Sequence, residues 1–583
     1  MRAGEGHERA LTRPRWMAEG WILAAILLLG FAIRVVFALL PRVVRWDEAA
    51  YQLIAQNLLS GRGYMEVLGA RDLQSPPMVA YLSVIGLTLH LPVELVTAGV
   101  SHVLLGSLIP LPVYGLGREL YGTRAGLTAA LLAAIYPALA VSPLYWSTMT
   151  ESPYLLFTMC GLYAARRTAF GGAWRWAITL GVSYGLAYLA RPEAAVYMAL
   201  MILYILVVSW YGSRHPAARQ ANVPQSIAGG RQHGLWRAVA TSLASLVVFG
   251  LIAFPYVNYL HRATGRWLLS GKQGISMDIA WAYVNRSQAM HDLAVASLDT
   301  AGREIMWLSP ERFGRTLQGW ILEDPRRFVQ LVRANVSETW RVLFHQDMFT
   351  PWVAALMALG LFAVPWTRSR FRDELLLLLA LAGLMSLWAF FVLSRFMSLA
   401  VLVGLLWASA GLDHLAGWAE ASTRGLASGE QGNLSGQMSR FKRTFVRTVP
   451  LAATAMALIL AGLQVSRSEI ARLPFGRLET ARWLAQRIPA GTPIMARDSE
   501  VPLYAGLPMV AFPNAEWPQV LAYGRARGAR YLVLESRAMA ELRPRLTAVI
   551  GASGVNSVPG LTYLAGIGDS DNPTWIYALE PSP

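Results

Sequence analysis

Long apolar runs separated by short polar gaps make up most of this 583-residue chain. A helix that spans a bilayer needs about 20 predominantly apolar residues, and most of the runs approach or exceed that length. The pattern therefore predicts an all-α polytopic membrane bundle of about 11 transmembrane helices plus juxtamembrane helices. The predicted spans lie at roughly 20–40, 95–118, 123–141, 152–168, 172–190, 193–211, 237–258, 351–366, 375–393, 395–413 and 446–465.

Whether the apolar segment Met78–His90 spans the membrane decides on which side of the membrane each later loop lies. At about 13 residues it is too short to span, so we expect it to lie in the interface or to re-enter. Every loop on the N-terminal side is then basic, as the positive-inside rule requires, whereas a spanning segment would put the basic loops outside. The N-terminus is predicted to be cytoplasmic. The predicted outside features are the first outside loop 42–94, the loop 142–151, the turn 191–193, the segment 259–350 and the chain from about 466.

Composition supports a membrane protein. The chain is 55% hydrophobic and 15% charged, with a mean hydropathy of +0.39, whereas a soluble domain has about 25% charged residues. The net charge of +16 lies in the gaps between apolar runs, which indicates a lipid bilayer and no nucleic acid as the partner. The single cysteine, Cys160, excludes an internal disulfide and a thiolate metal cluster. The first run has no convincing cleavage site, so we expect a retained first helix.

Two stretches of low apolar content, 212–236 and 418–445, are predicted to need no fold. The second is the expected cytoplasmic linker between a membrane module at 1–417 and a last transmembrane helix at 446–465. The rest of the chain, 466–583, is expected to be a small soluble α/β domain outside the cytoplasm, large enough at about 115 residues to bury its own core. Its predicted helices are Arg477–Ile488, Glu516–Arg527 and Met539–Val549, and its predicted strands are Pro493–Ala496, Arg530–Glu535, Thr562–Ala565 and Trp575–Leu579.

The carboxylates Asp47 and Glu48 follow the first apolar run, where the chain leaves the hydrocarbon. Charged groups are costly to bury at a membrane, so these two residues are candidate functional residues. The two residues open a helical pattern that ends at Ser60-Gly61, which predicts an amphipathic helix lying on the membrane. The alternative is that they only complement the helix dipole, an effect of about 0.3–1 kcal/mol.

Further charged residues lie in loops predicted on the same face. Glu151 starts an apolar helix and is either a functional carboxylate or a first-turn residue behind an N-cap at Thr150. Arg191 and Arg395 occupy outside turns, where each either binds a phosphate or snorkels to lipid headgroups. Glu193 follows a proline that suits the first position of a helix.

Arg34 lies inside the first predicted span, at a cost of about 2.5–3.5 kcal/mol on insertion scales. It is expected to face the bundle interior and to pair with a carboxylate or a lipid headgroup. The histidines lack metal-ligand spacing, and neither a phosphate-cradling glycine loop nor a Gly-x-Ser-x-Gly nucleophile elbow occurs. The sequence therefore gives no support to nucleotide-sugar or serine-hydrolase chemistry.

Six short motifs follow one another along the predicted outer face. They are Trp46-Asp47-Glu48-Ala49-Ala50-Tyr51, Asn57-Leu58-Leu59-Ser60-Gly61-Arg62-Gly63-Tyr64, Ser75-Pro76-Pro77-Met78, Met149-Thr150-Glu151-Ser152-Pro153, Ala190-Arg191-Pro192-Glu193 and Ser394-Arg395-Phe396. In this order they resemble the GT-C superfamily of integral-membrane glycosyltransferases. The closest likeness is to bacterial members related to protein O-mannosyltransferases and to the aminoarabinose transferase of lipid A. The resemblance covers about 1–415.

The resemblance implies a glycosyltransferase of the cell membrane. Such an enzyme moves a sugar from a polyprenyl-phosphate donor to a hydroxyl of a glycan, lipid or protein on the outer face. It implies Asp47 as the general base of a single displacement that inverts the anomeric centre. Partial burial is expected to raise the pKa of this carboxylate toward a useful base strength.

The resemblance also implies roles for further residues. Glu48 and Glu151 are catalytic candidates, and Glu151 would orient the acceptor or join Asp47 in holding a divalent metal, the one cofactor implied. Arg71 would replace a lysine that some relatives carry before the short helix and that the segment 72–77 lacks. The candidates for the donor phosphate are Arg191, Arg395 and Arg71, and the candidates on the acceptor side are Tyr51, Tyr64 and Glu193.

Two other functions fit the pattern. A transporter would also have many spans and intramembrane charges, but the distinctive charges here cluster on one face, whereas transporter sites lie near the midplane. A non-catalytic scaffold of a cell-envelope assembly pathway would share the architecture. Covalent attachment of a labelled sugar to an acceptor discriminates the enzyme from both. The C-terminal domain either shapes acceptor access or acts as a scaffold.

Overall fold

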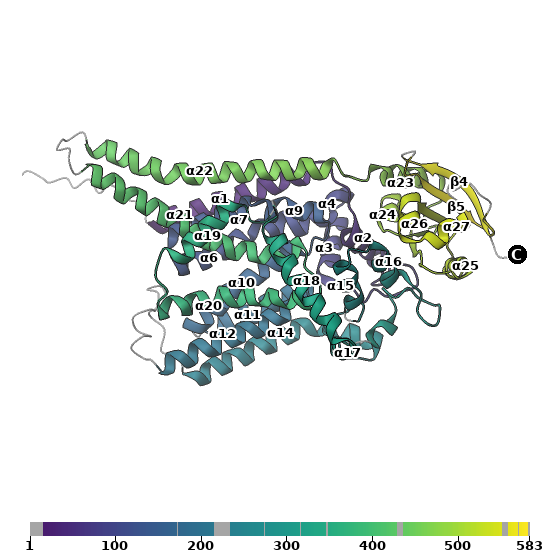
Figure 1. Cartoon of the computed structure of the whole chain (residues 1–583), viewed down its shortest axis with the longest axis horizontal. Coiled ribbons are helices and arrows are strands. Elements are labelled where there is room, and N and C mark those ends of the chain that lie inside the picture. The colour runs from purple at the N-terminus through teal and green to yellow at the C-terminus, as the bar shows by residue number, and fades with distance from the viewer. Residues whose placement is uncertain are drawn as a thin grey trace, which may run out of the picture.

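The computed structural model describes residues 15–580 except 172, 215–233, 273, 315, 346–347, 428–434, 551–557 and 569–570. Long helices run side by side along the longest axis of the molecule, and a small sheet-containing domain lies at one end of them (Figure 1). Shorter helices from the middle of the chain lie between the long helices and this domain (Figure 1).

The first half of the chain forms most of the bundle. Its helices are α1 (Arg15–Ala38), α2 (Trp46–Leu59), α3 (Pro77–Thr88), α4 (Val93–Thr97), η1 (Ala98–Leu105), α5 (Gly106–Leu108), α6 (Pro110–Tyr121), α7 (Thr123–Ile135), α8 (Pro137–Ala140), α9 (Ser142–Trp146), α10 (Glu151–Gly171), α11 (Trp174–Ala190), α12 (Ala194–Arg214) and α14 (Leu235–Thr264).

The middle of the chain first forms short helices and then returns to the bundle. These helices are α15 (Ser276–Val284), α16 (Gln288–Ala296), η2 (Pro310–Gly314), α17 (Leu317–Glu323), α18 (Pro325–Leu343), α19 (Pro351–Phe362), α20 (Arg368–Leu384), η3 (Met385–Ala389), η4 (Ser394–Met397), α21 (Ser398–Ala427) and α22 (Ser435–Ile470).

The C-terminal domain follows α22. Its elements are α23 (Phe475–Arg487), β1 (Ile494–Ala496), α24 (Glu500–Ala505), β2 (Met509–Ala511), α25 (Trp517–Ala526), β3 (Tyr531–Glu535), α26 (Ser536–Leu542), α27 (Pro544–Ile550), β4 (Leu561–Ile567) and β5 (Thr574–Leu579).

Among the described residues, six helices are long and apolar enough to cross a membrane, fewer than the predicted eleven or so. They are Met17–Ala38, Val93–Tyr121, Ala194–Tyr211, Leu235–Thr264, Ser394–Ser422 and Thr448–Ile470. Other predicted spans are shorter or more polar helices. The predicted span at 123–141, for example, breaks after α7 because Tyr136 precedes Pro137 and takes an extended backbone (φ −64°, ψ 129°).

Arg34 is fully buried in the bundle, as expected, but its partners are backbone carbonyls. Its guanidinium donates to the carbonyl oxygens of Gly30 at 3.1 Å, Ala134 at 3.0 Å and Leu139 at 3.2 Å. The last two lie on either side of the break between α7 and α8, where helix ends leave carbonyls without intrahelical partners. The expected carboxylate or headgroup partner is therefore corrected, because Arg34 is used to satisfy this break.

The predicted linker 418–445 is helical wherever the structure describes it. α21 continues to Ala427 and α22 begins at Ser435, so the expectation of a linker without a fold is corrected. Both helices extend beyond the bundle at the end opposite the sheet domain (Figure 1). Extending an existing helix costs far less than nucleating one, which favours this continuation. The other predicted linker, 212–236, lies mostly outside the described residues.

The C-terminal domain has the expected mixture of helices and strands. Its strand order is β2-β1-β3-β5-β4; β1 pairs in parallel with β2 and β3, and β5 pairs antiparallel with β3 and β4. The four predicted strands are confirmed. The sequence pattern does not predict β2 and α24, which have three and six residues. The predicted helix Met539–Val549 is two helices, because Pro544 interrupts it.

Part of the core of the C-terminal domain is shared with the membrane module. One buried cluster joins the inner side of its sheet to Val44, Ala49 and Leu53 at the start of the chain and to Ile305 and Leu308 in the middle. A second buried cluster, which includes Leu484, Ile494 and Ile576, consists of residues of the domain alone. The domain therefore buries part of its core by itself, as expected from its length, and shares the rest. Burial of apolar area across the junction fixes the domain against the bundle.

α2 lies between the bundle and the C-terminal domain. One of its faces joins the shared core, and the other packs Tyr51 and Ile54 against the bundle. Eight of its 14 residues are buried, including the polar Glu48, Gln52 and Asn57. The predicted helix is confirmed, but its expected place on a membrane surface is corrected, because protein covers both of its faces.

Asp292 of α16 provides a polar clamp on the domain. Its carboxylate accepts hydrogen bonds from Arg497 Nε at 2.9 Å, Arg543 Nε at 2.8 Å and Asn514 Nδ2 at 2.9 Å. The Asp292 and Arg543 side chains are only 3% and 1% exposed. A buried pair of this kind stabilises the junction only while both partners are present.

Asp292→Ala should loosen the C-terminal domain, because it leaves Arg543 charged and unpaired in the interior, at a cost of about 3–5 kcal/mol. The thermal unfolding midpoint should fall, and limited proteolysis should cut between α22 and α23. The matched control Glu541→Ala removes an exposed pair with Arg537 and should change neither result. A wild-type cleavage pattern in Asp292→Ala would show that the clamp does not hold the domain.

Candidate active site

The N-terminal turn of α2 faces segments from far along the chain. Asp47 Oδ2 lies 3.2 Å from Arg395 Nη1 on η4, although 348 positions separate the two residues. Both side chains remain accessible, Asp47 at 38% and Arg395 at 21%. The structure thus brings two of the predicted site residues together as an ion pair that a ligand can reach.

Glu48 points into the protein, whereas Asp47 is accessible, because consecutive helix residues point about 100° apart. Glu48 is fully buried and forms an ion pair with Arg42. Arg42 also donates to the carbonyls of Glu94 and Leu144, and the Glu48 backbone N–H donates to the Ser147 carbonyl at 2.9 Å. Burial raises the pKa of Glu48, and Arg42 opposes this. Glu48 therefore ties loops together behind the site.

Glu151 and Arg191 form a second carboxylate–cation set. Glu151 is buried at the start of α10, where it accepts a hydrogen bond from Thr148 Oγ1 at 2.6 Å. Its Oε1 lies 3.9 Å from Arg191 Nη1, and Arg191 Nη2 lies 3.0 Å from Glu193 Oε1. The Arg191 guanidinium also stacks 4.4 Å from the ring centre of Phe396. Since Phe396 follows the partner of Asp47 in the chain, the two sets are adjacent.

Lys272 is a further cation of the site, and the sequence reasoning misses it. It lies in the loop between α14 and α15 and interacts electrostatically with both Asp47 and Glu193. A compositional signal was present, because only Lys272 and Lys442 are lysines among the 51 basic residues of the chain. Lysine carries a compact charge on a flexible stem and is not equivalent to arginine. A lone lysine in a loop predicted to lie outside is therefore a candidate for a role that arginine does not fill.

The surrounding cations set the charge of Asp47. Burial would raise the pKa of this carboxyl, but Arg395, Lys272 and Arg191 together outweigh burial and hold the pKa below its ordinary value. The prediction of a raised pKa is therefore wrong. Asp47 is ionised at neutral pH, and its basicity is low while Arg395 stays paired with it.

Backbone strain is concentrated near the two carboxylates. Trp46, Ser147 and Met149 have positive φ angles of 51°, 49° and 56°, in the left-handed region that non-glycine residues rarely adopt. One of them precedes Asp47, and the other two lie just before Glu151. Such strain persists only where surrounding contacts enforce it, and it is typical of functional sites.

The remaining sequence candidates have different positions. Tyr51 is buried and lies within the electrostatic field of the site carboxylates, so it belongs to the site. Tyr64 is engaged elsewhere, with its hydroxyl donating to the Ser75 carbonyl at 2.9 Å. Arg71 is exposed, and in the described part of the chain no ion pair or hydrogen bond links it to Asp47.

The described residues do not complete a ligand set for a divalent metal around Asp47 and Glu151. Asp47 is already surrounded by cations, and Glu151 is engaged by a hydroxyl and a guanidinium. Among the described residues, no group of three or more His, Cys, Asp or Glu side chains is placed to hold a metal ion. The two carboxylates therefore act as partners of cationic side chains.

Comparisons with known proteins concern the fold and one segment. Residues 74–221 match the family model described as dolichyl-phosphate-mannose-protein mannosyltransferase. The structure is similar to ArnT from Cupriavidus metallidurans bound to undecaprenyl phosphate, with a TM-score of 0.52 and 16% identity over 96% of this chain and 98% of that chain. For the apo state of ArnT the TM-score is 0.53 and the identity 14%, with the same coverage.

A weaker similarity is to the oligosaccharyltransferase AglB from Archaeoglobus fulgidus, with a TM-score of 0.49 and 15% identity over 95% of this chain and 74% of that chain. No curated protein matches the sequence. At these identities the similarity to ArnT establishes a shared fold.

Glu66, in the loop after α2, is a further titratable group at the edge of the site. It accepts a hydrogen bond from Ser499 Oγ, and burial, reinforced by the charge of Asp72, raises its pKa to about 8. A carboxyl whose pKa is raised in the folded state takes up a proton on folding. Its contribution to stability is present below its unfolded pKa and is lost as the pH rises to about 8.

Glu66→Gln should therefore flatten the pH dependence of stability. The wild-type thermal unfolding midpoint should fall from pH ~5 to ~8, whereas the variant, which keeps a neutral group of the same shape, should lack this fall and be more stable at pH above about 8. Glu541→Gln, at an exposed position on α26, should follow the wild type. A Glu66→Gln profile parallel to the wild type would assign the pH dependence to other groups.

Proposed function

The chain resembles the GT-C superfamily of membrane glycosyltransferases in its fold and over residues 74–221, and on that premise we propose that it transfers a sugar from a polyprenyl-phosphate donor. The observation that carries this proposal is the position of Asp47. It is an accessible carboxylate at the end of an apolar bundle, and it faces Arg395, Lys272 and Arg191. Transfer from a lipid-linked sugar phosphate requires a base and phosphate-binding cations side by side.

The cations suit a lipid phosphate. Guanidinium and ammonium groups form strong charge-assisted hydrogen bonds with phosphate oxygens. Arg191 is held by two carboxylates and an aromatic ring, whereas Arg395 pairs with the accessible Asp47, and the charge of Lys272 acts on the same carboxylate. That a protein of this fold was crystallised with undecaprenyl phosphate supports a polyprenyl phosphate as the carrier here.

Donor binding would activate the base. A phosphate that binds Arg395 competes with Asp47 for the same guanidinium. As this pairing weakens, the pKa of Asp47 rises from its depressed value, and the carboxylate becomes a better proton acceptor. The low basicity of Asp47 in the unliganded protein is thus compatible with its role as the base of the bound complex.

The proposed reaction is a single displacement. The acceptor hydroxyl oxygen attacks the anomeric carbon and gives its proton to Asp47, while the bond from that carbon to the phosphate oxygen breaks. The electron pair of that bond leaves with the polyprenyl phosphate, whose charge the cations stabilise, so no separate general acid is required. Attack opposite the leaving group inverts the anomeric centre. The acceptor is a hydroxyl of a glycan, a lipid or a protein.

The other carboxylates would have supporting roles. Glu48 holds Arg42 and the loops behind the site, and Glu151 with Glu193 orients Arg191 toward the donor. The site and the C-terminal domain lie at the same end of the bundle (Figure 1). We assign this end to the outer face of the cell membrane and the N-terminus to the cytoplasm, because the opposite loops are basic.

Asp47→Asn should lower donor turnover by about 10²–10⁴-fold, the usual range for loss of a general base. The assay supplies purified protein in detergent–lipid with a panel of labelled polyprenyl-phosphate sugars and acceptors, and follows release of free polyprenyl phosphate. Donor binding should persist in the variant, because the three cations remain. Equal turnover of variant and wild type would remove Asp47 from the role of base.

Lys272→Gln and Arg395→Gln should each weaken donor binding. Loss of one charge-assisted hydrogen bond costs about 1.5–3 kcal/mol, which corresponds to about a 10- to 100-fold higher KM for the donor. Arg262→Gln, at an exposed position on the last turn of α14, is the matched loss of a charge and should leave the KM unchanged. A change of the same size in all three variants would indicate a general charge effect.

A further inference from the structure

The C-terminal domain contacts the start of α2 directly. The Trp46 backbone N–H donates to Glu500 Oε1 at 3.2 Å, and the Val44 N–H donates to the Tyr504 hydroxyl at 2.9 Å. Both partners lie on α24. Arg45, at the N-cap position of α2, forms no side-chain cap hydrogen bond. Since the first N–H groups of a helix lack intrahelical partners, Glu500 takes the place of a cap residue that the local sequence does not supply.

Glu500 is held in this position by a cluster of ion pairs. It is fully buried, and its Oε1 lies 2.8 Å from Arg477 Nη1, so one oxygen receives both Arg477 and the Trp46 amide. Arg477 also pairs with Asp498 at 2.9 Å and with Glu535 at 2.7 Å. The Arg477–Glu500 pair fixes the direction in which Glu500 presents its oxygen to α2.

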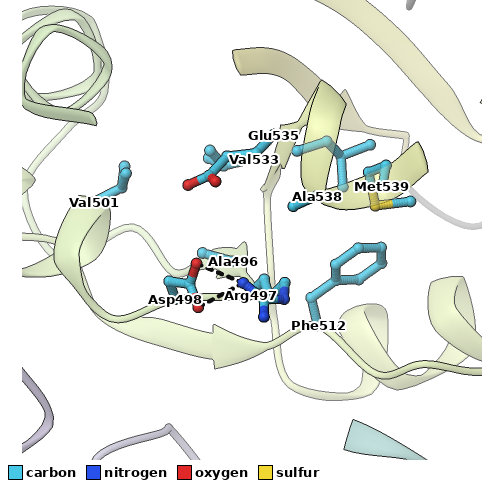
Figure 2. A pocket seen from close by; sticks show the side chains of 10 residues that line it. Ala496, Arg497, Asp498, Val501, Phe512, Val533, Glu535, Ala538 and Met539 are labelled. Carbon is cyan, nitrogen blue, oxygen red and sulfur yellow. Dashed lines mark hydrogen bonds and ion pairs between the residues drawn. The ribbon is translucent and has the colours of Figure 1, made fainter. Parts of the chain in front are cut away.

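The ion-pair cluster occupies the edge of the sheet at which α/β domains bind ligands. The parallel order β2-β1-β3 creates a topological switch between β1 and β3, and such domains bind ligands outside the carboxyl ends of the strands at that point. Asp498 follows β1 there, and Glu535 ends β3 (Figure 2). The cavity between them has a volume of about 20 Å³, room for about one water molecule. This edge is thus filled by its own side chains.

We propose that Glu500 is a positioning residue for Asp47 and that the C-terminal domain is part of the catalytic apparatus. Both neighbours of Asp47 have their backbone amides fixed from outside the helix. The Trp46 amide is bound by Glu500, and the Glu48 amide by the Ser147 carbonyl at 2.9 Å. Fixing both amides sets the direction in which the Asp47 side chain leaves α2. The catalytic part of this inference rests on the proposed function, whereas the hydrogen bond between the Trp46 amide and Glu500 does not depend on it.

Two alanine variants of the full-length protein separate positioning from general stability. Glu500→Ala removes the cap, and Glu535→Ala removes another carboxylate from the same Arg477 without any hydrogen bond or ion pair to α2 among the described residues. Glu500→Ala should lower kcat by about 10- to 100-fold with the donor KM unchanged, because a small misplacement of a catalytic group has that effect. Glu535→Ala should keep the wild-type kcat.

Conservative variants test the same contact with less risk to folding. Glu500→Gln keeps an acceptor oxygen for the Trp46 amide and should restore most of the kcat lost in Glu500→Ala. Tyr504→Phe removes only the hydroxyl bound to Val44 and should lower kcat in the same direction by a smaller factor. Equal losses of kcat in Glu500→Ala and Glu535→Ala would overturn the proposal.

Hydrogen exchange at the amides of residues 44–48 measures the positioning without any chemistry. Exchange should become faster in Glu500→Ala and in Tyr504→Phe and stay at the wild-type rate in Glu535→Ala. Unchanged exchange in Glu500→Ala, or an equal increase in all three variants, overturns the positioning role. Absence of turnover in the wild type, together with the expected exchange pattern, would instead overturn the proposed function and leave the contact established.

Discussion

A carboxylate at the end of an apolar bundle must be compensated by cations, and this requirement organises the candidate site. Burial of a charged group without a partner costs several kcal/mol, so Asp47 stays ionised only beside Arg395, Lys272 and Arg191. Full pairing would abolish its usefulness as a base. In the proposed reaction the partial exposure of the Asp47–Arg395 pair resolves this conflict, because the entering donor phosphate takes over the arginine and releases the carboxylate.

The position of α2 determines whether that exchange can occur. The helix is held from the bundle side by the Glu48–Arg42 pair and the Ser147 carbonyl, and from the other side by Glu500. Asp47 is the acidic residue of this first turn that remains accessible. Adjacent acidic residues thus have opposite tasks, because the turn of the helix sends one side chain into the protein and the other toward the accessible space.

Much of this architecture follows from local patterns in the sequence, whereas the long-range contacts do not. Apolar periodicity predicted α2 and most strands, and basic gaps predicted that the loops carrying Asp47, Glu151 and Arg395 share one face. Pairing across 348 positions cannot be derived from spacing. The field of Arg395 and Lys272, which reverses the expected pKa shift of Asp47, could therefore not be predicted either. The same holds for the shared core and the carbonyl partners of Arg34, because periodicity shows which face is buried and not what covers it.

Electrostatic attraction also favours the docking of the C-terminal domain against the N-terminus of α2. Arg477 faces the three carboxylates of Asp498, Glu500 and Glu535, and Arg497 also pairs with Asp498 at 2.8 Å. The N-terminus of a helix carries about half a positive charge, and α2 presents that end to Glu500. Asp47 lies in the same turn and would compete with Glu500 for the same amides. The two carboxylates avoid this competition, because Glu500 accepts the hydrogen bond of the Trp46 amide and Asp47 faces the cations instead. The domain that caps α2 thereby leaves its carboxylate available for chemistry.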